Sequence, residues 1–203
     1  MKTGVFGGTF SPPHRGHLEM AKAAKKQLML DEILFMPCGT PPHKDEKRVI
    51  SQIDRFNMTK LLIEDIKDFK ISDFEIKNSG KSYSAKTLSA LKKAYPQNEL
   101  YFIVGADSLC YMDEWMKPEI IFKNAEIAAI ARSGISAKHL FEYAEFLKEK
   151  YGAVIHFVEM ENIDISSSLL RDMILHNTDI SEYTSDKVYR YIKERELYGY
   201  RKD

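Results

Sequence analysis

Short apolar runs alternate along this chain with longer segments whose apolar residues recur at helical spacing. Strands are expected at residues 3–6, 33–36, 71–76, 101–104, 126–131 and 154–158. Helices are expected at 16–28, after a capping Ser51, from a capping Ser84 to about Tyr95, and at 137–150. This alternation is typical of a parallel sheet whose strands are joined by crossover helices. It predicts a doubly wound α/β fold, in which ligands bind at the carboxyl ends of the strands.

Two more helical patterns close the chain, one after Ser166 and one near 186–195. No linker, repeat or low-complexity segment precedes them, so we expect a single domain over residues 1–203. It would consist of a Rossmann-like core at 1–165 and a small C-terminal helical subdomain at 166–203. A chain of 203 residues is long enough to bury one sizeable core.

The charge balance bears on the choice of partner. Lys plus Arg number 30, as do Asp plus Glu, so the formal net charge is zero. A nucleic acid polymer or an anionic membrane would favour a basic face, so neither is expected as a partner.

The two cysteines, Cys38 and Cys110, are too few for a disulfide framework. The first residues lack the apolar segment of a signal peptide, and the apolar stretch 127–131 is too short to span a bilayer. A cytoplasmic protein is expected. The sequence does not decide whether the protein forms a homo-oligomer.

The first expected strand runs into Gly7-Gly8-Thr9-Phe10, and His14-Arg15-Gly16-His17 follows where the next helix begins. A glycine pair after a buried strand lets the backbone approach a ligand closely. The free N–H groups and the dipole of a helix N-terminus favour an anion. His14 and His17 are three residues apart, so both side chains can point to the same place. A lone surface histidine would mean little, but these features together indicate a functional site that faces an anion.

Other motifs fit this segment less well. No third glycine stands at the spacing of a dinucleotide fingerprint, and no Gly-Lys-Ser/Thr follows as in a P-loop. The histidines lack a third ligand at a spacing typical of zinc, so no metal-ligating residues are expected.

A second polar segment, Ile165-Ser166-Ser167-Ser168-Leu169-Leu170-Arg171, precedes the first closing helix. A serine run at this place caps a helix and leaves N–H and hydroxyl donors for an anion. Arg171 lies one turn inward and can hold phosphate oxygens with its forked guanidinium. Taken alone, the three serines can simply be helix-capping residues. Together with the first motif, they are more readily explained as residues that bind phosphate.

The first motif resembles the phosphate-binding signature of the nucleotidyltransferase superfamily, which includes the class I aminoacyl-tRNA synthetases. Segment 165–171 is similar to the Ile-Ser-Ser-Thr-x-x-Arg signature of the same superfamily. The chain is too short for a synthetase and has no Lys-Met-Ser-Lys-Ser-like loop. Four further segments resemble the bacterial nicotinate mononucleotide adenylyltransferases, and with the two motifs they span nearly the whole chain.

Two of these segments lie in the first half of the chain. Pro41-Pro42-His43-Lys44 is similar to the family's Pro-Pro-His-Lys loop, from which Lys44 can bring a charge to phosphate; an exposed basic loop is the plain alternative. The segment 82–88 is similar to Ser-Tyr-Thr-x-Asp-Thr-Leu. Ser84 keeps the hydroxyl of the family's threonine, but Lys86 reverses the charge of its aspartate, so no role is assigned to Lys86.

The other two segments lie in the second half. Gly105-Ala106-Asp107-Ser108 puts a carboxylate after a strand, where it can accept from ribose hydroxyls. Trp115, the only tryptophan, can stack on a pyridine ring, although simple packing is its alternative. Residues 183–198 are similar to the family's closing helix, with Thr184-Ser185 in place of its Leu-Pro. Ser11 stands where the family commonly has Asp or Asn.

The resemblance implies transfer of AMP from ATP to nicotinate mononucleotide, giving nicotinate adenine dinucleotide and pyrophosphate in NAD biosynthesis. Mg²⁺ is expected as a cofactor carried by the ATP phosphates. The implied catalytic residues are His14, His17, Lys44 and Arg171. The implied acceptor-binding residues are Lys44, Tyr83, Ser84, Thr87 and Trp115. The implied ATP-binding residues are Gly7, Gly8, Thr9, Phe10, His14, His17, Gly105, Asp107, Ile165, Ser166, Ser167, Ser168 and Arg171.

Two alternatives stay open. The acceptor can be another phosphate, such as nicotinamide mononucleotide or phosphopantetheine, although the Pro-Pro-His-Lys loop, the Ser84 segment and Trp115 favour nicotinate mononucleotide. A non-catalytic nucleotide-binding sensor would keep the fold, but intact His14, His17 and Arg171 argue for an enzyme. A purely structural module would not require these phosphate-directed residues.

Overall fold

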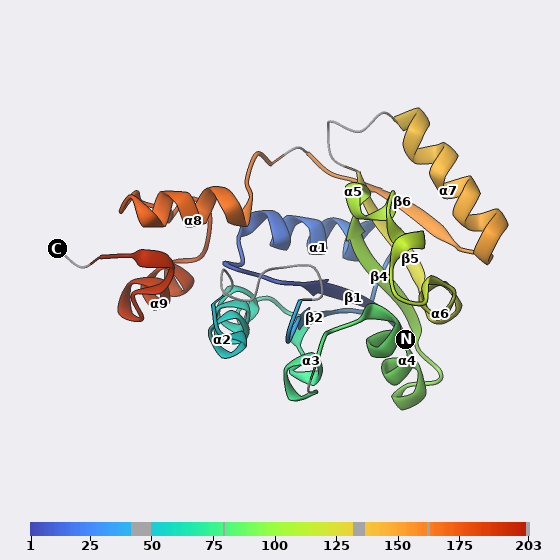
Figure 1. Ribbon diagram of the computed structural model, residues 1–203, viewed down its shortest axis with the longest axis horizontal. Coiled ribbons are helices and arrows are strands. Elements are labelled where there is room, and N and C mark those ends of the chain that lie inside the picture. Colours follow the sequence, from blue (N-terminus) through green and yellow to red (C-terminus); the bar gives the residue numbers. More distant parts are fainter. Residues whose placement is uncertain (42–49, 79, 132–136, 162, 202–203) are drawn as a thin grey trace.

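The computed structural model of the protein describes residues 1–41, 50–78, 80–131, 137–161 and 163–201. Six strands form one parallel sheet in the order β3-β2-β1-β4-β5-β6 (Figure 1). They are β1 (Lys2–Gly8), β2 (Glu32–Pro37), β3 (Phe69–Ile71), β4 (Glu99–Gly105), β5 (Glu126–Ala131) and β6 (Ile155–Glu159). The chain builds outward from β1 to β3 and resumes with β4 on the other side of β1. The predicted Rossmann-like doubly wound fold is therefore confirmed, with its switch point between β1 and β4.

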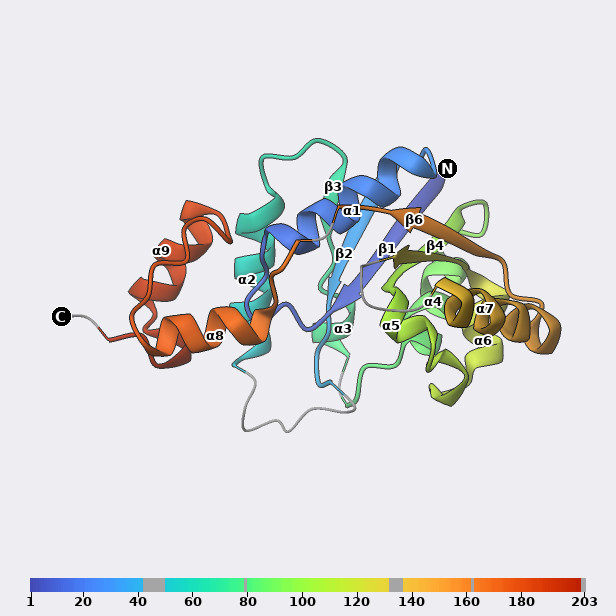
Figure 2. The ribbon, with the colours of Figure 1, turned by 90° about the horizontal axis from the view of Figure 1, so that it is seen from above.

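Helices cover both faces of this sheet. One buried cluster joins the sheet to α1 (Arg15–Gln27), α2 (Gln52–Ile63), α8 (Ser167–Leu175) and α9 (Asp186–Glu194). A second cluster joins it to α4 (Ser84–Ala94), α5 (Ala106–Leu109), α6 (Pro118–Asn124) and α7 (Ala137–Tyr151). In both views α8 and α9 lie at one end of the molecule, and α6 and α7 at the other (Figures 1 and 2).

The inner strand β4 reads as a continuous apolar run from Leu100 to Val104 because both of its faces are covered. In β4, Tyr101 and Ile103 belong to the first cluster, whereas Phe102 and Val104 belong to the second. Successive side chains of a strand point to opposite faces, so a strand buried on both sides needs apolar residues at every position.

Serine caps begin three of the helices. The side chains of Ser51, Ser166 and Ser185 accept the backbone N–H groups of Asp54, Leu169 and Val188. The predicted caps at Ser51 and Ser166 are confirmed. The cap predicted at Ser84 is wrong, because Ser84 is the first residue of α4 and Tyr83 is its N-cap residue.

The strand expected at 71–76 is wrong beyond Ile71. β3 ends there, and the short helix α3 (Phe74–Lys77) follows. β3 lies at the sheet edge, and the Ser72 hydroxyl accepts the Phe74 N–H, which turns the chain out of the strand. The elements between β4 and β5 were not predicted: α5, the 3-10 helix η2 (Met112–Glu114) and α6 have seven residues or fewer, too few to show a period.

The C-terminal helices are tied to α2 by polar contacts as well as by the core. The Tyr191 hydroxyl donates to Asp54 at 2.8 Å, and the Arg195 guanidinium lies 3.3 Å from the same carboxylate oxygen. Lys187 forms an ion pair with Glu64 at 2.6 Å.

None of the helices in the described ranges is long and apolar enough to cross a membrane.

Candidate active site

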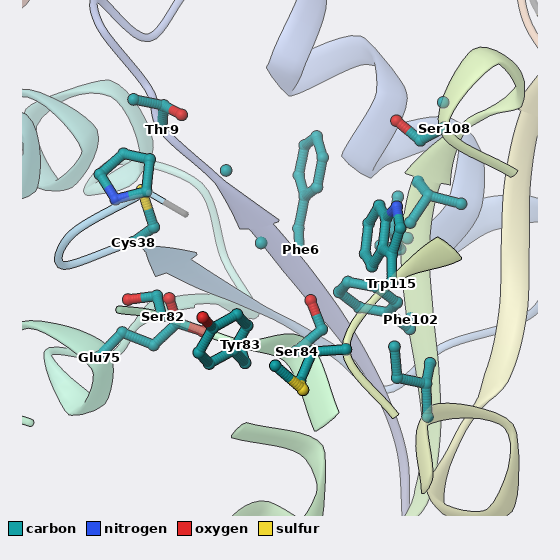
Figure 3. Close-up of a pocket in the computed structure, with 18 residues that line it drawn as sticks. Phe6, Thr9, Cys38, Glu75, Ser82, Tyr83, Ser84, Phe102, Ser108 and Trp115 are labelled. Atoms are coloured by element: carbon teal, nitrogen blue, oxygen red, sulfur yellow. The ribbon is translucent and has the colours of Figure 1, made fainter. Parts of the chain in front are cut away.

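A pocket of about 390 Å³ opens at the carboxyl ends of β1 and β4, the strands on either side of the switch point. Thr9, Cys38 and Glu75 lie toward one side of it, and Trp115 and Ser108 toward the other (Figure 3). Its lining includes seven of the residues singled out from the sequence: Gly7, Gly8, Thr9, Tyr83, Ser84, Gly105 and Trp115.

The turn after β1 is shaped around Phe10. This residue has a φ of 49°, and its side chain is only 2% exposed. A Cβ on Gly8 would lie 2.8 Å from the Phe10 ring, so a glycine is required for the ring to fold back under the strand end. The Phe10 ring meets the His17 ring edge-on, with 5.0 Å between their centroids. The Phe10 side chain therefore supports His17, and any contact between Phe10 and a nucleotide would come from its backbone.

His14 and His17 lie side by side at the start of α1. Their ring centroids are 3.7 Å apart, and His14 is the buried N-cap residue of the helix. The His14 backbone N–H donates to His17 Nδ1 at 3.1 Å. Because Nδ1 accepts this bond, a neutral His17 carries its proton on Nε2 and can donate a hydrogen bond from there.

Gly16 is the point where the two motifs touch. A Cβ at this position would lie 2.7 Å from Ile165 Cγ2 and 2.9 Å from His14 Nδ1. Only a residue without a side chain lets Ile165, at the start of the second motif, pack against the first motif.

Hydrogen bonds from α8 to the loop of the first motif join the motifs further. The Ser167 hydroxyl donates to the Pro12 carbonyl at 2.9 Å. Arg171 donates from Nη1 to the Ser11 carbonyl at 2.7 Å and from Nη2 to Ser168 Oγ at 3.1 Å. Ser11, which departs from the pattern that the resemblance implies, therefore binds Arg171 through its backbone carbonyl. Two of the five guanidinium N–H groups make these bonds, so the fork has further donors for an anion.

The other side of the pocket is aromatic. Trp115 meets Phe102 edge-on, with 6.2 Å between centroids, and Ser84 and Tyr83 lie on the adjoining wall (Figure 3). At the end of β4, a Cβ on Gly105 would collide with Asp107 Oδ1, so the glycine lets this carboxylate fold over the strand end.

Two pocket residues, Glu75 and Cys38, were not anticipated from the sequence. Burial raises the pKa of the Glu75 carboxyl, although a hydrogen bond from Thr87 opposes this shift. The Thr87 hydroxyl donates to Glu75 Oε1 at 2.5 Å and is itself buried, so Thr87 lies behind Glu75 rather than on the pocket lining. Burial likewise raises the pKa of the Cys38 thiol.

The raised pKa of Glu75 makes a prediction about stability. The folded protein favours the protonated carboxyl, so the contribution of Glu75 to stability is lost as the pH rises from the ordinary pKa of 4.5 through the higher folded value. Glutamine carries no charge and can still accept from Thr87. We therefore expect the stability of Glu75→Gln relative to wild type to increase with pH, as measured by urea unfolding at acidic and alkaline pH. The exposed Glu149→Gln should show no such trend, and a pH-independent difference at Glu75 would refute the argument.

Two lysines of the family segments are not among the pocket residues described above. Lys44 lies outside the described residues. Lys86 is exposed on the first turn of α4 and does not line this pocket. Across the described ranges, no three His, Cys, Asp or Glu side chains are grouped to hold a metal ion.

Comparison with known proteins agrees with this architecture. A family model described as cytidylyltransferase-like matches residues 5–173. A Carboxydothermus hydrogenoformans protein named "Probable nicotinate-nucleotide adenylyltransferase" is 40% identical over 97% of this chain and 98% of its own. A Clostridium tetani protein of the same name is 37% identical over the same shares. The solved Plasmodium falciparum nicotinic acid mononucleotide adenylyltransferase complexed with NaAD superposes with a TM-score of 0.81 at 20% identity, covering 98% of each chain. The chain therefore belongs to the cytidylyltransferase-like family of nucleotidyltransferases, among the nicotinate-nucleotide adenylyltransferases.

Proposed function

We propose that this enzyme transfers the AMP moiety of ATP to the phosphate of nicotinate mononucleotide, giving nicotinate adenine dinucleotide and pyrophosphate in NAD biosynthesis. The observation that carries the proposal is the pocket itself. Its wall runs from the Gly7–Thr9 turn of the first motif to the indole of Trp115. The shared name of relatives that are 37–40% identical over nearly the whole chain supports the same reaction.

The chemistry needs positioning and charge stabilisation more than a base. The nucleophile is a phosphate monoester whose second pKa is about 6, so it is largely ionised at neutral pH. It attacks the α-phosphorus of ATP in line, and the bond to the leaving pyrophosphate breaks. Donors aimed at the phosphates stabilise the charge that develops. In our proposal His17 supplies Nε2–H, Arg171 supplies its fork, and His14 and Lys44 complete the catalytic set.

The ATP side of the site is formed by the two joined motifs. We assign ATP contacts to the backbone of 7–10, to His14 and His17, to Gly105 and Asp107, and to 165–168 with Arg171. Mg²⁺ enters with ATP as part of the substrate. Mg²⁺ keeps several waters and binds substrate phosphates, so a site lined mainly by donors fits a metal brought in this way.

The acceptor side is assigned to the aromatic end of the pocket. Trp115 would stack on the pyridine ring, with Tyr83 and Ser84 beside it and Thr87 acting through Glu75. Lys44 would contact the acceptor phosphate. We further propose that 1–203 acts as one nucleotidyltransferase domain, with the helices of 166–203 completing the ATP side, and that the enzyme works in the cytoplasm, where ATP is abundant.

Removal of the indole tests the acceptor side. Trp115→Ala should raise KM for nicotinate mononucleotide about tenfold, because one stacking contact of this kind contributes about 1–3 kcal/mol. KM for ATP should change little. Tyr95→Ala, which removes an exposed aromatic side chain at the end of α4, serves as the control. Equal KM values for the acceptor in Trp115→Ala and wild type would remove Trp115 from the acceptor site.

Product analysis tests the reaction itself. The purified protein, given ATP, Mg²⁺ and nicotinate mononucleotide, should form the dinucleotide and pyrophosphate in equal amounts. Pyrophosphate without dinucleotide would indicate hydrolysis of ATP, and would contradict the proposed transfer.

A further inference from the structure

Arg55 is a charged residue on the buried face of α2. Its side chain is 1% exposed, and it is among the largest fully buried side chains of the protein. It lies on the same helical face as Met58 and Leu62, three and seven residues further on, both of which belong to the core. Burial of a guanidinium is costly unless its N–H groups are satisfied. The bonds that Arg55 makes are therefore the main clue to its role.

These bonds reach three separate segments. Nη1 donates to the Thr9 carbonyl at 2.9 Å, Nη2 to the Gly39 carbonyl at 2.6 Å, and Nε to the Ile50 carbonyl at 3.4 Å. Nη1 also lies 3.5 Å from Cys38 Sγ. One planar fork thus joins the turn after β1, the segment after β2 and the segment that leads into α2. Lysine has no such fork and could not hold three carbonyls in this arrangement.

Both segments that Nη1 and Nη2 bind belong to the walls of the pocket. Thr9 precedes Phe10, whose ring supports His17. Gly39 donates its N–H to Ser82 Oγ at 2.9 Å, and a Cβ on Gly39 would collide with the Glu75 carbonyl. Arg55 therefore connects the phosphate-directed turn to the wall formed by Ser82 and Glu75.

We propose that Arg55 is a positioning residue, which sets the first motif in register with the pocket wall formed by Ser82 and Glu75. Arg55 does not line the pocket, so it acts through Thr9, Cys38 and Gly39. The inference rests on the proposed function, because an in-line transfer requires both substrates to be aligned. A misplacement of about 1 Å can cost a factor of about 100 in rate.

Arg55→Lys tests this role, with Met58→Ala as the matched control on the same helix. We expect kcat per folded molecule of Arg55→Lys to fall about 10- to 100-fold, with both KM values within about threefold of wild type. Hydrogen exchange should become faster in the peptides around Thr9 and Gly39, a result that needs no turnover. In Arg55→Ala, added guanidinium at non-denaturing concentration should restore part of kcat. Met58→Ala should lose stability but keep kcat, because it removes only packing.

Several results would overturn the proposal. One is Arg55→Lys with reduced stability but a wild-type kcat per folded molecule. Another is a failure of both Arg55 variants to fold at low temperature, because Arg55 would then serve the fold and not the site. Unchanged exchange around Thr9 and Gly39 would also contradict it. If the wild type itself released no pyrophosphate, the proposed function would fail, whereas the exchange result would still decide whether Arg55 holds the two segments.

Discussion

Replacement of His17 by alanine is expected to lower kcat about 100- to 1000-fold, the usual effect of removing one donor that faces the charge developing in a transition state. The His14 N–H donates to Nδ1 of His17, so the donor Nε2–H is held in place before substrate binds. The edge of the Phe10 ring limits where the imidazole can turn. A donor held in this way costs little reorganisation during the reaction.

The same change should affect stability far less. It removes the hydrogen bond from the His14 N–H, worth about 1 kcal/mol, and the contact with the Phe10 ring. Steady-state kinetics with saturating ATP and acceptor, together with thermal unfolding, separate the two effects. His139→Ala, an exposed histidine on α7, should match the wild type in both measurements. An unchanged kcat in His17→Ala would remove His17 from the mechanism.

Replacement of Arg171 by alanine is expected to have an effect at least as large, about a thousandfold on kcat, because arginines that stabilise transferring phosphates contribute about this much or more. Arg171 also donates to the Ser11 carbonyl and to Ser168, so its loss loosens the junction of the two motifs. Arg171→Lys keeps the charge but not the fork. It should recover only a small part of kcat, since bidentate contacts need the planar guanidinium.

The control for this experiment is Arg190→Ala, an exposed arginine on α9. It should leave kcat and both KM values unchanged. If Arg171→Lys matched the wild type, charge alone would suffice and the forked contact would have no role. If Arg171→Ala also had the kcat of the wild type, the second motif would have no part in the reaction.

Much of the fold could be predicted because the sheet is buried on both faces. Apolar runs such as 126–131 coincide with β5 to the residue. The edge strand β3 has only three residues and pairs with a single strand. The apolar pattern of the sequence continues to Ile76, but the strand itself ends at Ile71. The short helices between β4 and β5 are held by tertiary contacts, and local periodicity gives no sign of them.

The candidate site divides in a similar way. The two motifs could be found because each is a contiguous segment at a helix start. The bonds between them could not, because Ser167 and Arg171 reach carbonyls 155 and 160 residues away in sequence. Arg55 did leave a signal: a charged residue stands on the apolar face of a helix, at helical spacing from Met58 and Leu62. Glu75 gave no such signal, because it lies in the short helix α3, where the apolar pattern of the sequence predicts a strand.

The closing segment of the chain illustrates the same limit. The Tyr198 hydroxyl lies 3.1 Å from Ser11 Oγ, and burial raises the pKa of this phenol well above its ordinary value. Its aromatic character predicts packing, and packing is part of its role. The hydrogen bond to the loop of the first motif depends on the route of the C-terminal helices around α2, which no local pattern encodes.

The most direct test of the account is the rate of pyrophosphate release with ATP and Mg²⁺, compared among nicotinate mononucleotide, nicotinamide mononucleotide and phosphopantetheine at equal concentrations. We predict a strong preference for nicotinate mononucleotide. Activity with only one of the other acceptors would keep the transfer chemistry but contradict the assignment of the Trp115 pocket. Tight binding of ATP with no pyrophosphate release from any of the three would contradict the central claim and indicate a nucleotide-binding sensor.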